Sequence, residues 1–241
     1  MSGHSRWHQI RHRKALTDAK KGKLFSKMAR LIAVAAKEKG ADPAMNSKLR
    51  MAVESARAVG MPKENIERAI SRGAGGIGGE AFEEVRYEAY GPGGAALLIL
   101  GVTDNKNRTT SEVKHLLAEY AGKLAIEGSV AWLFKKMGAV DFPKESVGSA
   151  PEELTLTLID AGADDVQEFP EGFTAYVNPD SLEEFKEELG RKGLAFSRVR
   201  VDYVPTNPIL LSEDDKAKLA SLLEALDEHD DVQEVYTNVN L

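Results

Sequence analysis

The glycine-rich segment GAGGIGGE at residues 73–80 constrains the fold of this chain most, because the hydrophobic periodicity changes across it. Before it, apolar residues recur every three or four positions, which is the spacing of an amphipathic helix. After it, apolar residues alternate or form short continuous runs, which is typical of strands. A change of periodicity at a flexible glycine hinge indicates that the two sides fold as separate units.

Three short helices are predicted before the hinge, because proline and glycine delimit three amphipathic segments. Glycine commonly follows the last residue of a helix, and proline is favoured at the first helical position. Asp42 is the expected N-cap of the second helix. We therefore expect residues 1–80 to form a helical N-terminal domain. The residues that mark the helix ends and starts are Gly40, Pro43, Gly60, Pro62 and Gly73.

Strand and helix signals after the hinge fall into two groups. Residues 136–205 follow the order strand, helix, strand, strand, helix, strand, which is that of a ferredoxin-like domain. Residues 81–135 are predicted to form a hairpin, a helix capped by Thr109 and a strand at SVAWLF. Residues 206–241 add one more helix and strand.

The pentapeptide DDVQE occurs twice, at residues 164–168 and 230–234, each time after a predicted helix and at the start of a predicted strand. A chance match is possible, but the shared context favours two variations of one design. The final helix and strand would then complete the sheet begun in residues 81–135, so that 81–135 and 206–241 form one discontinuous domain. The prediction is an α+β fold of three domains: an N-terminal helical bundle and two α/β domains, at least one ferredoxin-like.

Charge is distributed unevenly along the chain. Residues 1–80 contain 17 Lys and Arg against 7 Asp and Glu, a net charge of +10, whereas the rest of the chain carries −16. Such a field attracts polyanions to the N-terminal end and repels them elsewhere. The chain has no cysteine, which excludes disulfides and thiolate chemistry. No apolar run approaches the roughly 18 residues of a membrane span, and we expect a cytoplasmic protein.

The stretch GHSRWHQIRHRKALTDAKKGK at residues 3–23 suits a polyanion better than a metal ion. His8 and His12 have the spacing of the zinc motif H-E-x-x-H, but Gln9 replaces its glutamate and the neighbouring cations would repel a metal. The same cations match phosphate oxygens, and Trp7 can stack on a base. We therefore expect a nucleic-acid contact and no metal site.

The first predicted helix continues this basic surface. Four of its cations fall within about an 80° arc beside the apolar arc, so we expect them to be exposed. Neutralising the first three together should then weaken nucleic-acid binding without unfolding the domain. No helix carries the base-reading side chains of a recognition helix, so sequence-specific readout is not expected. The four cations are Lys23, Lys27, Arg30 and Lys37.

Six motifs cover much of the chain: GHSRWHQIRHRKALTDAKKGKLFSK, ADPAMNSKLR, MPKENIERAISRGAGG, YEAYGPGGAALLI, DNKNRT and GSVAWLF. Together they resemble the YebC/PmpR family, which has a mitochondrial relative, the translational activator of cytochrome c oxidase subunit one. The resemblance implies a helical N-terminal domain followed by two α/β domains. It also implies a DNA-binding transcriptional regulator, as members are usually described. The alternative is a ribosome-associated factor that binds ribosomal RNA and relieves stalling at proline-rich stretches.

The resemblance adds weight to particular positions, including His12 and Lys20 in the basic motif. In DNKNRT, a helix cap explains the Asn and Thr residues but does not require a guanidinium, so Arg108 is the functional candidate there. The chain departs from the family where AGKLAIEGSVA replaces the common GGNLG before GSVA. The complete set of expected nucleic-acid-binding residues is Arg6, Trp7, Arg11, His12, Arg13, Lys14, Lys20, Lys21, Lys23, Lys27, Arg30, Lys37 and Arg108.

Two other classes of function remain open on the residues alone. Many enzymes use α/β domains, but the G-x-G-x-x-G pattern that starts at Gly73 follows a predicted helix and not the strand that a dinucleotide site needs. We find no P-loop or nucleophile elbow in the sequence, and we expect no catalysis and no cofactor. The third class is a protein-interaction module, in which the acidic domains bind a basic partner or the basic end of another copy.

Overall fold

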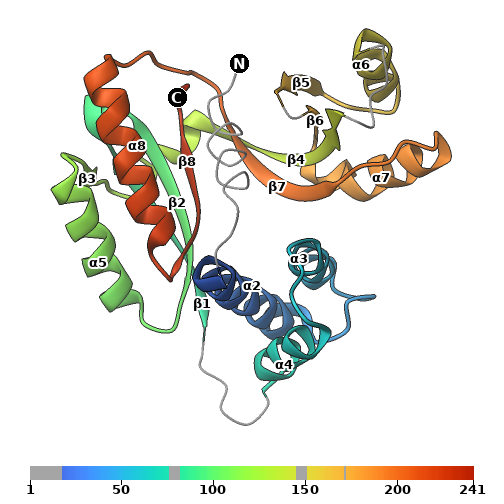
Figure 1. Ribbon diagram of the computed structural model, residues 1–241, viewed down its shortest axis with the longest axis horizontal. Coiled ribbons are helices and arrows are strands. Elements are labelled where there is room, and N and C mark those ends of the chain that lie inside the picture. Colours follow the sequence, from blue (N-terminus) through green and yellow to red (C-terminus); the bar gives the residue numbers. More distant parts are fainter. Residues whose placement is uncertain (1–17, 76–81, 145–150, 171) are drawn as a thin grey trace.

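The computed structural model describes residues 18–75, 82–144, 151–170 and 172–241, and it confirms the predicted α+β fold (Figure 1). The chain forms an N-terminal helical bundle and two four-stranded antiparallel sheets with helices packed on them. The bundle lies below both sheets in Figure 1. Among the described residues, no helix combines the length and the apolar composition that a membrane span requires.

The bundle contains the three predicted helices: α2 (Asp18–Lys39), α3 (Ser47–Ala58) and α4 (Lys63–Gly73). They surround one apolar core in which Ile32, Leu49 and Ala56 are fully buried. Gly73 ends α4 so close to α2 that an added Cβ atom would lie 2.1 Å from the carbonyl oxygen of Ala33. The close packing of these two helices therefore requires glycine at this position.

The second helix begins later than predicted, because Asn46 caps it and Asp42 does not. The Asn46 side-chain oxygen accepts a hydrogen bond from the Leu49 N–H at 3.0 Å, in the first turn of α3. The Asn46 amide nitrogen donates to the carbonyl oxygens of Ala35 and Gly40 at 2.7 and 2.8 Å. One fully buried side chain thus satisfies the end of α2 and the start of α3.

The first sheet has the strand order β3-β1-β2-β8, so the last strand of the chain pairs with β2, a strand from its first half. The strands are β1 (Glu83–Tyr90), β2 (Ala96–Thr103), β3 (Lys123–Leu124) and β8 (Val232–Thr237). Two helices, α5 (Lys106–Glu119) and α8 (Glu213–Glu228), pack against it (Figure 1). Leu97 and Ile99 of β2 belong to the same buried core as Leu219 and Leu222 of α8.

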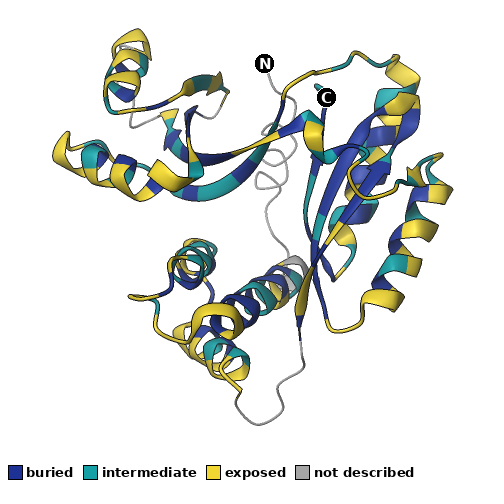
Figure 2. Cartoon of the chain, turned by 180° about the vertical axis from the view of Figure 1, so that it is seen from behind, coloured by how far each residue is buried: buried dark blue, intermediate teal, exposed yellow. Residues whose placement is uncertain are grey.

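The second sheet has the order β5-β6-β4-β7, which confirms the ferredoxin-like prediction. Strand β6 lies between β5 and β4 of the first β-α-β unit, and β4 lies between β6 and β7 of the second. Figure 2 shows that the central strands β2 and β6 are largely buried, whereas the outer surfaces of the helices are exposed. The elements are β4 (Phe134–Pro143), α6 (Pro151–Asp160), β5 (Asp165–Phe169), β6 (Gly172–Val177), α7 (Leu182–Arg191) and β7 (Arg198–Pro205).

Three local predictions around the first sheet were wrong or incomplete. The predicted strand at SVAWLF is largely a short 3-10 helix, η2 (Ala131–Leu133), followed directly by β4. Strand β4 therefore crosses the predicted boundary between residues 135 and 136, and the division into domains stays a prediction. Helix α5 is capped by Asn105, which accepts from the Arg108 N–H at 3.1 Å, whereas the expected cap Thr109 is buried inside the helix.

Candidate nucleic-acid interface

The earliest candidate residues lie outside the described part of the chain. Lys20 lies in the first turn of α2, and Lys21 beside it is exposed. The contacts of the remaining candidates, which come from α2 and α5, are described below. The candidates outside the described residues are Arg6, Trp7, Arg11, His12, Arg13 and Lys14.

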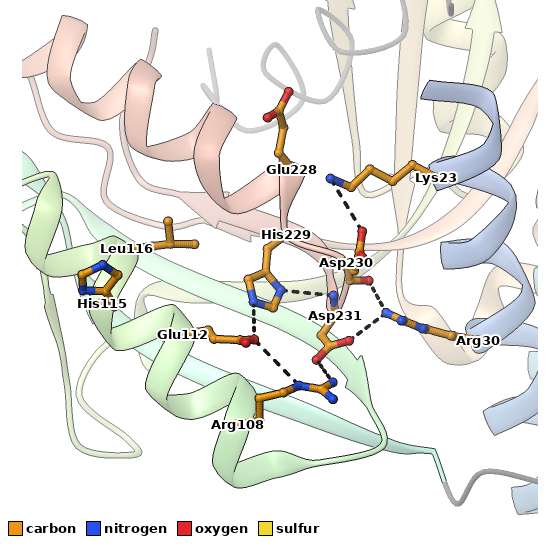
Figure 3. Close-up of a pocket in the computed structure, with 10 residues that line it drawn as sticks. All are labelled: Lys23, Arg30, Arg108, Glu112, His115, Leu116, Glu228, His229, Asp230 and Asp231. Carbon is orange, nitrogen blue, oxygen red and sulfur yellow. Dashed lines mark hydrogen bonds and ion pairs between the residues drawn. The ribbon is translucent and has the colours of Figure 1, made fainter. Parts of the chain in front are cut away.

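The central cations of α2 contact the C-terminal part of the chain. The Lys27 ammonium donates to the carbonyl oxygen of Asp227 at 2.5 Å, and Lys27 is only 5% exposed. The Arg30 guanidinium donates to the Asp231 carboxylate at 2.7 Å. Helix α2 is therefore held to the corner where α8 leads into β8 (Figure 3).

The outer cations of the same helix face also have partners in the chain. The Lys23 ammonium lies 3.6 Å from the Asp230 carboxylate, and Lys37 donates to the carbonyl oxygen of Phe82 at 3.1 Å. The prediction of an exposed stripe is therefore wrong for the buried Lys27. The other three cations are more accessible, but each is hydrogen-bonded or ion-paired within the chain.

Helix α2 is buried on two sides, which explains this difference. Its predicted apolar arc packs inside the bundle. Ala33 and Val34 pack in a second cluster with Phe82, which directly precedes β1, and Val102 of β2. Lys27 precedes Val34 by seven residues, which places both on one side of the helix. The cations therefore point toward the sheet that this second apolar contact brings close.

Asp231, directly before β8, is the centre of the contact. Its carboxylate accepts hydrogen bonds from Arg30 at 2.7 Å and Arg108 at 2.8 Å. It also accepts from the hydroxyl groups of Thr109 at 2.6 Å and Thr103 at 3.2 Å. Burial alone would raise the pKa of Asp231, but the hydrogen bonds from Thr109 and Arg108 and the charge of Arg30 lower it. One ionised carboxylate thus joins α2, α5 and β2 to the start of β8.

Arg108, the candidate from the DNKNRT loop, has two carboxylate partners. Its guanidinium donates to Asp231 at 2.8 Å and to Asp104 at 2.7 Å, while its side chain remains 43% exposed. The bond to Asp231, followed by the bond to Asp104, raises the pKa of Arg108. In this conformation the guanidinium that the sequence suggested as a phosphate donor holds α5 against β8.

His229, Glu112 and Asp231 bring three potential metal ligands within 4.8 Å of one another. The Asp231 N–H donates to His229 Nδ1 at 3.1 Å, so the proton of this imidazole lies on Nε2, 3.0 Å from Glu112. Both carboxylate oxygens of Asp231 accept from arginine. A cation would have to displace a guanidinium and withstand its charge, so the group suits hydrogen bonding better than metal binding.

An open pocket of about 570 Å³ lies between these elements (Figure 3). Lys23, Arg30 and Arg108 in its lining face four carboxylates of the same lining. Because cations and carboxylates alternate, the pocket has no field of one sign to attract a polyanion. The carboxylates at the corner where α8 leads into β8, the acidic corner, thus serve as partners for the basic helix α2 of the same chain.

The two copies of DDVQE show how the tertiary structure decides a residue's role. Both follow a helix and lead into a strand, β5 and β8, as the sequence indicated. Asp165 takes the place in the first copy that Asp231 takes in the second. However, Asp165 is exposed, and its carboxylate accepts from the adjacent Val166 N–H and the Gln167 side chain. The same pentapeptide therefore supplies an exposed strand end in one sheet and a buried junction in the other.

The described part of the bundle also contains exposed cations for which the structure shows neither an ion pair nor a side-chain hydrogen bond. Most of them lie outside the basic N-terminal motif, so the sequence motifs did not single them out. The sequence feature that could have identified them is their position on predicted helices, away from the apolar face. Arg68 and Arg72 are four residues apart and therefore lie on one face of α4. The set consists of Lys21, Lys39, Arg57, Arg68 and Arg72.

The basic helical bundle followed by two antiparallel sheet units defines a known class of three-domain proteins. Residues 5–76 match the family model described as TACO1/YebC protein N-terminal domain, and residues 82–239 match that of the TACO1/YebC second and third domain. The chain therefore belongs to the TACO1/YebC family, which confirms the resemblance seen in its motifs.

Relatives with similar sequences extend over the whole chain. A protein from Pseudothermotoga lettingae named "Probable transcriptional regulatory protein" is 45% identical over all of this chain and 94% of its own length. A protein of the same name from Dictyoglomus turgidum is 45% identical over all of this chain and 96% of its own. The crystal structure of a conserved hypothetical protein from Aquifex aeolicus superimposes with a TM-score of 0.89 at 44% identity, covering 97% of this chain and 96% of that one.

Proposed function

We propose that this chain is a nucleic-acid-binding regulator of gene expression that contacts phosphates mainly through its helical bundle. The observation that carries the proposal is a set of exposed bundle cations that make no ion pair or side-chain hydrogen bond with the described residues: Lys21, Lys39, Arg57, Arg68 and Arg72. Exposed guanidinium and ammonium groups of this kind bind phosphate oxygens at little cost, because no internal ion pair has to break. The names of the relatives, which describe regulation and not catalysis, favour a regulator over an enzyme.

The charge distribution orients the bundle toward a polyanion. The net charge of +10 in residues 1–80 attracts phosphates, whereas the net charge of −16 in the rest of the chain makes the sheets, on average, a less favourable surface for them. Each phosphate contact releases counterions, so affinity falls as salt rises, with a log–log slope of about 0.9 per contact on duplex DNA. This mode of binding recognises the backbone and gives little sequence specificity.

The cations of α2 play a different part in this proposal from the one that the sequence suggested. Lys27 and Arg30 are held by Asp227 and Asp231, so they position the bundle relative to the first sheet. The contact with phosphates falls to the exposed cations of α3, α4 and the ends of α2. The basic residues before Asp18 are expected to add further phosphate contacts.

A charge-matched pair of variants tests the proposal. The first replaces Arg57, Arg68 and Arg72 by alanine, and the control replaces Lys114, Lys144 and Lys192, three exposed cations outside the bundle. Binding of labelled duplex DNA and structured RNA is measured by anisotropy over a series of salt concentrations. The bundle variant should lose affinity and reduce the salt slope on DNA by about 2.7, which corresponds to three contacts. Equal losses in both variants would show that only net charge matters.

DNA is the proposed target because the relatives are named as transcriptional regulators. Ribosomal RNA presents the same phosphates, so the bundle alone does not distinguish the two polymers. Crosslinking in living cells followed by sequencing of the attached nucleic acid separates them. Reads at discrete promoters support the transcriptional role, whereas reads concentrated on ribosomal RNA would replace it with a role in translation.

A further inference from the structure

Trp132 is a large aromatic side chain that is 68% exposed. It lies in η2, within the segment that connects the strands of the first sheet to β4. Tryptophan is highly buried on average, so an exposed indole ring on a rigid backbone is a candidate for contact with a ligand. The same segment exposes Ile126, which is 84% accessible.

The segment that carries Trp132 is fixed by one buried carboxylate. Glu88 of β1 is only 3% exposed, and one of its oxygens accepts from the Gly128 N–H at 2.8 Å. The other accepts from the N–H groups of Val130 at 2.6 Å and Ala131 at 2.9 Å. Burial alone would raise the pKa of Glu88, but these three hydrogen bonds lower it. The carboxylate is therefore ionised and holds the backbone up to the residue before Trp132.

The indole ring has its polar group satisfied inside the segment. Its Nε1–H donates to the carbonyl oxygen of Ser129 at 3.0 Å, which also accepts from the Tyr90 hydroxyl at 3.3 Å. Ser129 closes a turn with Ile126 in which Gly128 has a φ of +88°, as a type II turn requires. The ring is thus oriented before any ligand arrives, and its remaining surface is a flat apolar face.

We propose that Trp132 is a stacking platform for an unpaired base of single-stranded nucleic acid. The proposal rests on the proposed function and adds a second contact, far in sequence from the bundle. Stacking needs only an aromatic face, and a face held in place loses little conformational entropy when a base binds. Lys135 and Lys136 follow on β4 and are exposed. Their Cα atoms lie within about 14 Å of that of Trp132, and because successive strand residues point to opposite faces, each lysine can reach flanking phosphates only on its own side of β4.

The chemistry around the ring favours a base over an apolar pocket in a partner protein. A protein pocket that covered Trp132 would also cover or crowd Lys135 and Lys136, and lysine is depleted at the cores of protein interfaces. A nucleic acid neutralises these cations with its own phosphates. A duplex keeps its base faces stacked inside, so the platform selects single strands, loops or bulges.

The test uses the full chain with Trp7→Phe, so that Trp132 is the single source of tryptophan fluorescence. The probes are unstructured RNA and DNA oligonucleotides of about 12 nucleotides, and an abasic strand of the same length that keeps the phosphates. Base stacking should quench Trp132 fluorescence with the two base-containing strands and not with the abasic strand. The RNA and DNA arms show which sugar the site accepts.

Substitutions then measure the contribution of the ring. Trp132→Ala should weaken binding of the base-containing strands about 5- to 150-fold and leave the abasic strand unchanged. Trp132→Phe, which keeps an aromatic face, should retain most of the affinity. Ile126→Ala, an equally exposed apolar position of the same segment, is the matched control and should have no effect.

The outcomes separate this proposal from the function on which it rests. If Trp132→Ala binds like its parent while the bundle variant loses affinity, the platform is refuted and the phosphate-binding function stands. An equal loss on the abasic strand, or an equal loss from Ile126→Ala, also refutes stacking. If the parent binds none of the oligonucleotides and none of the duplex or structured probes, both proposals fail.

Discussion

Replacing Asp231 by asparagine should destabilise the protein by about 3 kcal/mol at pH 7. The variant keeps the shape of the side chain and removes the charge that holds Arg30 and Arg108. The charged hydrogen bond from Thr109 is buried and contributes about 1.5–3 kcal/mol. The Arg30 side chain is 23% exposed, so solvent limits its ion pair with Asp231 to about 1 kcal/mol or less. Asparagine retains one acceptor, which offsets part of the loss.

The assay is unfolding followed by circular dichroism, with temperature and urea as denaturants. A loss of about 3 kcal/mol in a chain of this size corresponds to a decrease in Tm of about 6–12 °C. The repeated pentapeptide offers a matched control, because Asp165→Asn changes the same sequence position at the exposed start of β5. That substitution should change the stability by no more than about 0.5 kcal/mol.

The pH dependence provides a second check. The folded state lowers the pKa of Asp231, so its contribution is present above the ordinary aspartate pKa of about 3.9. The contribution is lost as the pH falls toward the lowered value, where the carboxylate takes up a proton. The stability difference between wild type and Asp231→Asn should therefore be full at pH 7 and shrink below about pH 4. A variant as stable as Asp165→Asn at pH 7 would refute the central role given to Asp231.

Three further substitutions test other parts of the structure. Lys27→Met keeps the apolar stem but removes the hydrogen bond from the ammonium group to the carbonyl oxygen of Asp227. It should lower the free energy of unfolding, measured with urea, by about 1–3 kcal/mol. Lys21→Met, the exposed control, should leave this free energy unchanged. Asn46→Ala removes a helix cap and two donors and should cost about 3 kcal/mol; an unchanged thermal transition would contradict its role as a junction. Glu88→Gln should speed amide hydrogen exchange at Val130 and its neighbours at pH 7, and equal protection in variant and wild type would show that the carboxylate does not hold the segment.

The contact between α2 and the acidic corner explains part of the uneven charge of the chain. Lys27 and Arg30 bring positive charge to a surface where Asp227, Asp230 and Asp231 bring negative charge. The opposite charges of the helical bundle and of the first sheet favour this docking over other arrangements of the two. The buried Asp231 fixes the geometry of the contact. The segregation of charge therefore orders the protein internally as well as directing a polyanion to one end.

The elements that depend on near neighbours could be predicted from the sequence. The three bundle helices follow from glycine and proline at their ends and from apolar residues at helical spacing. The ferredoxin-like order of residues 136–205 follows from alternating strand and helix patterns. The change of periodicity at residues 73–80 separated bundle from sheets for the same reason. In each case the deciding interactions join residues a few positions apart, and a sequence pattern records them directly.

Features set by distant residues required the tertiary structure. SVAWLF has the composition of a strand, but the Glu88 carboxylate binds the N–H groups of Val130 and Ala131 within it, and the segment forms η2. Lys27 has the pattern of a surface residue, but the packing of Val34 against the sheet region buries its side of α2. Asp165 and Asp231 stand in identical pentapeptides, and only the second meets Arg30. Local sequence thus determined which segments are helices and strands, whereas the docking of α2 determined which cations stay exposed, because burial depends on surfaces that far-separated residues bring together.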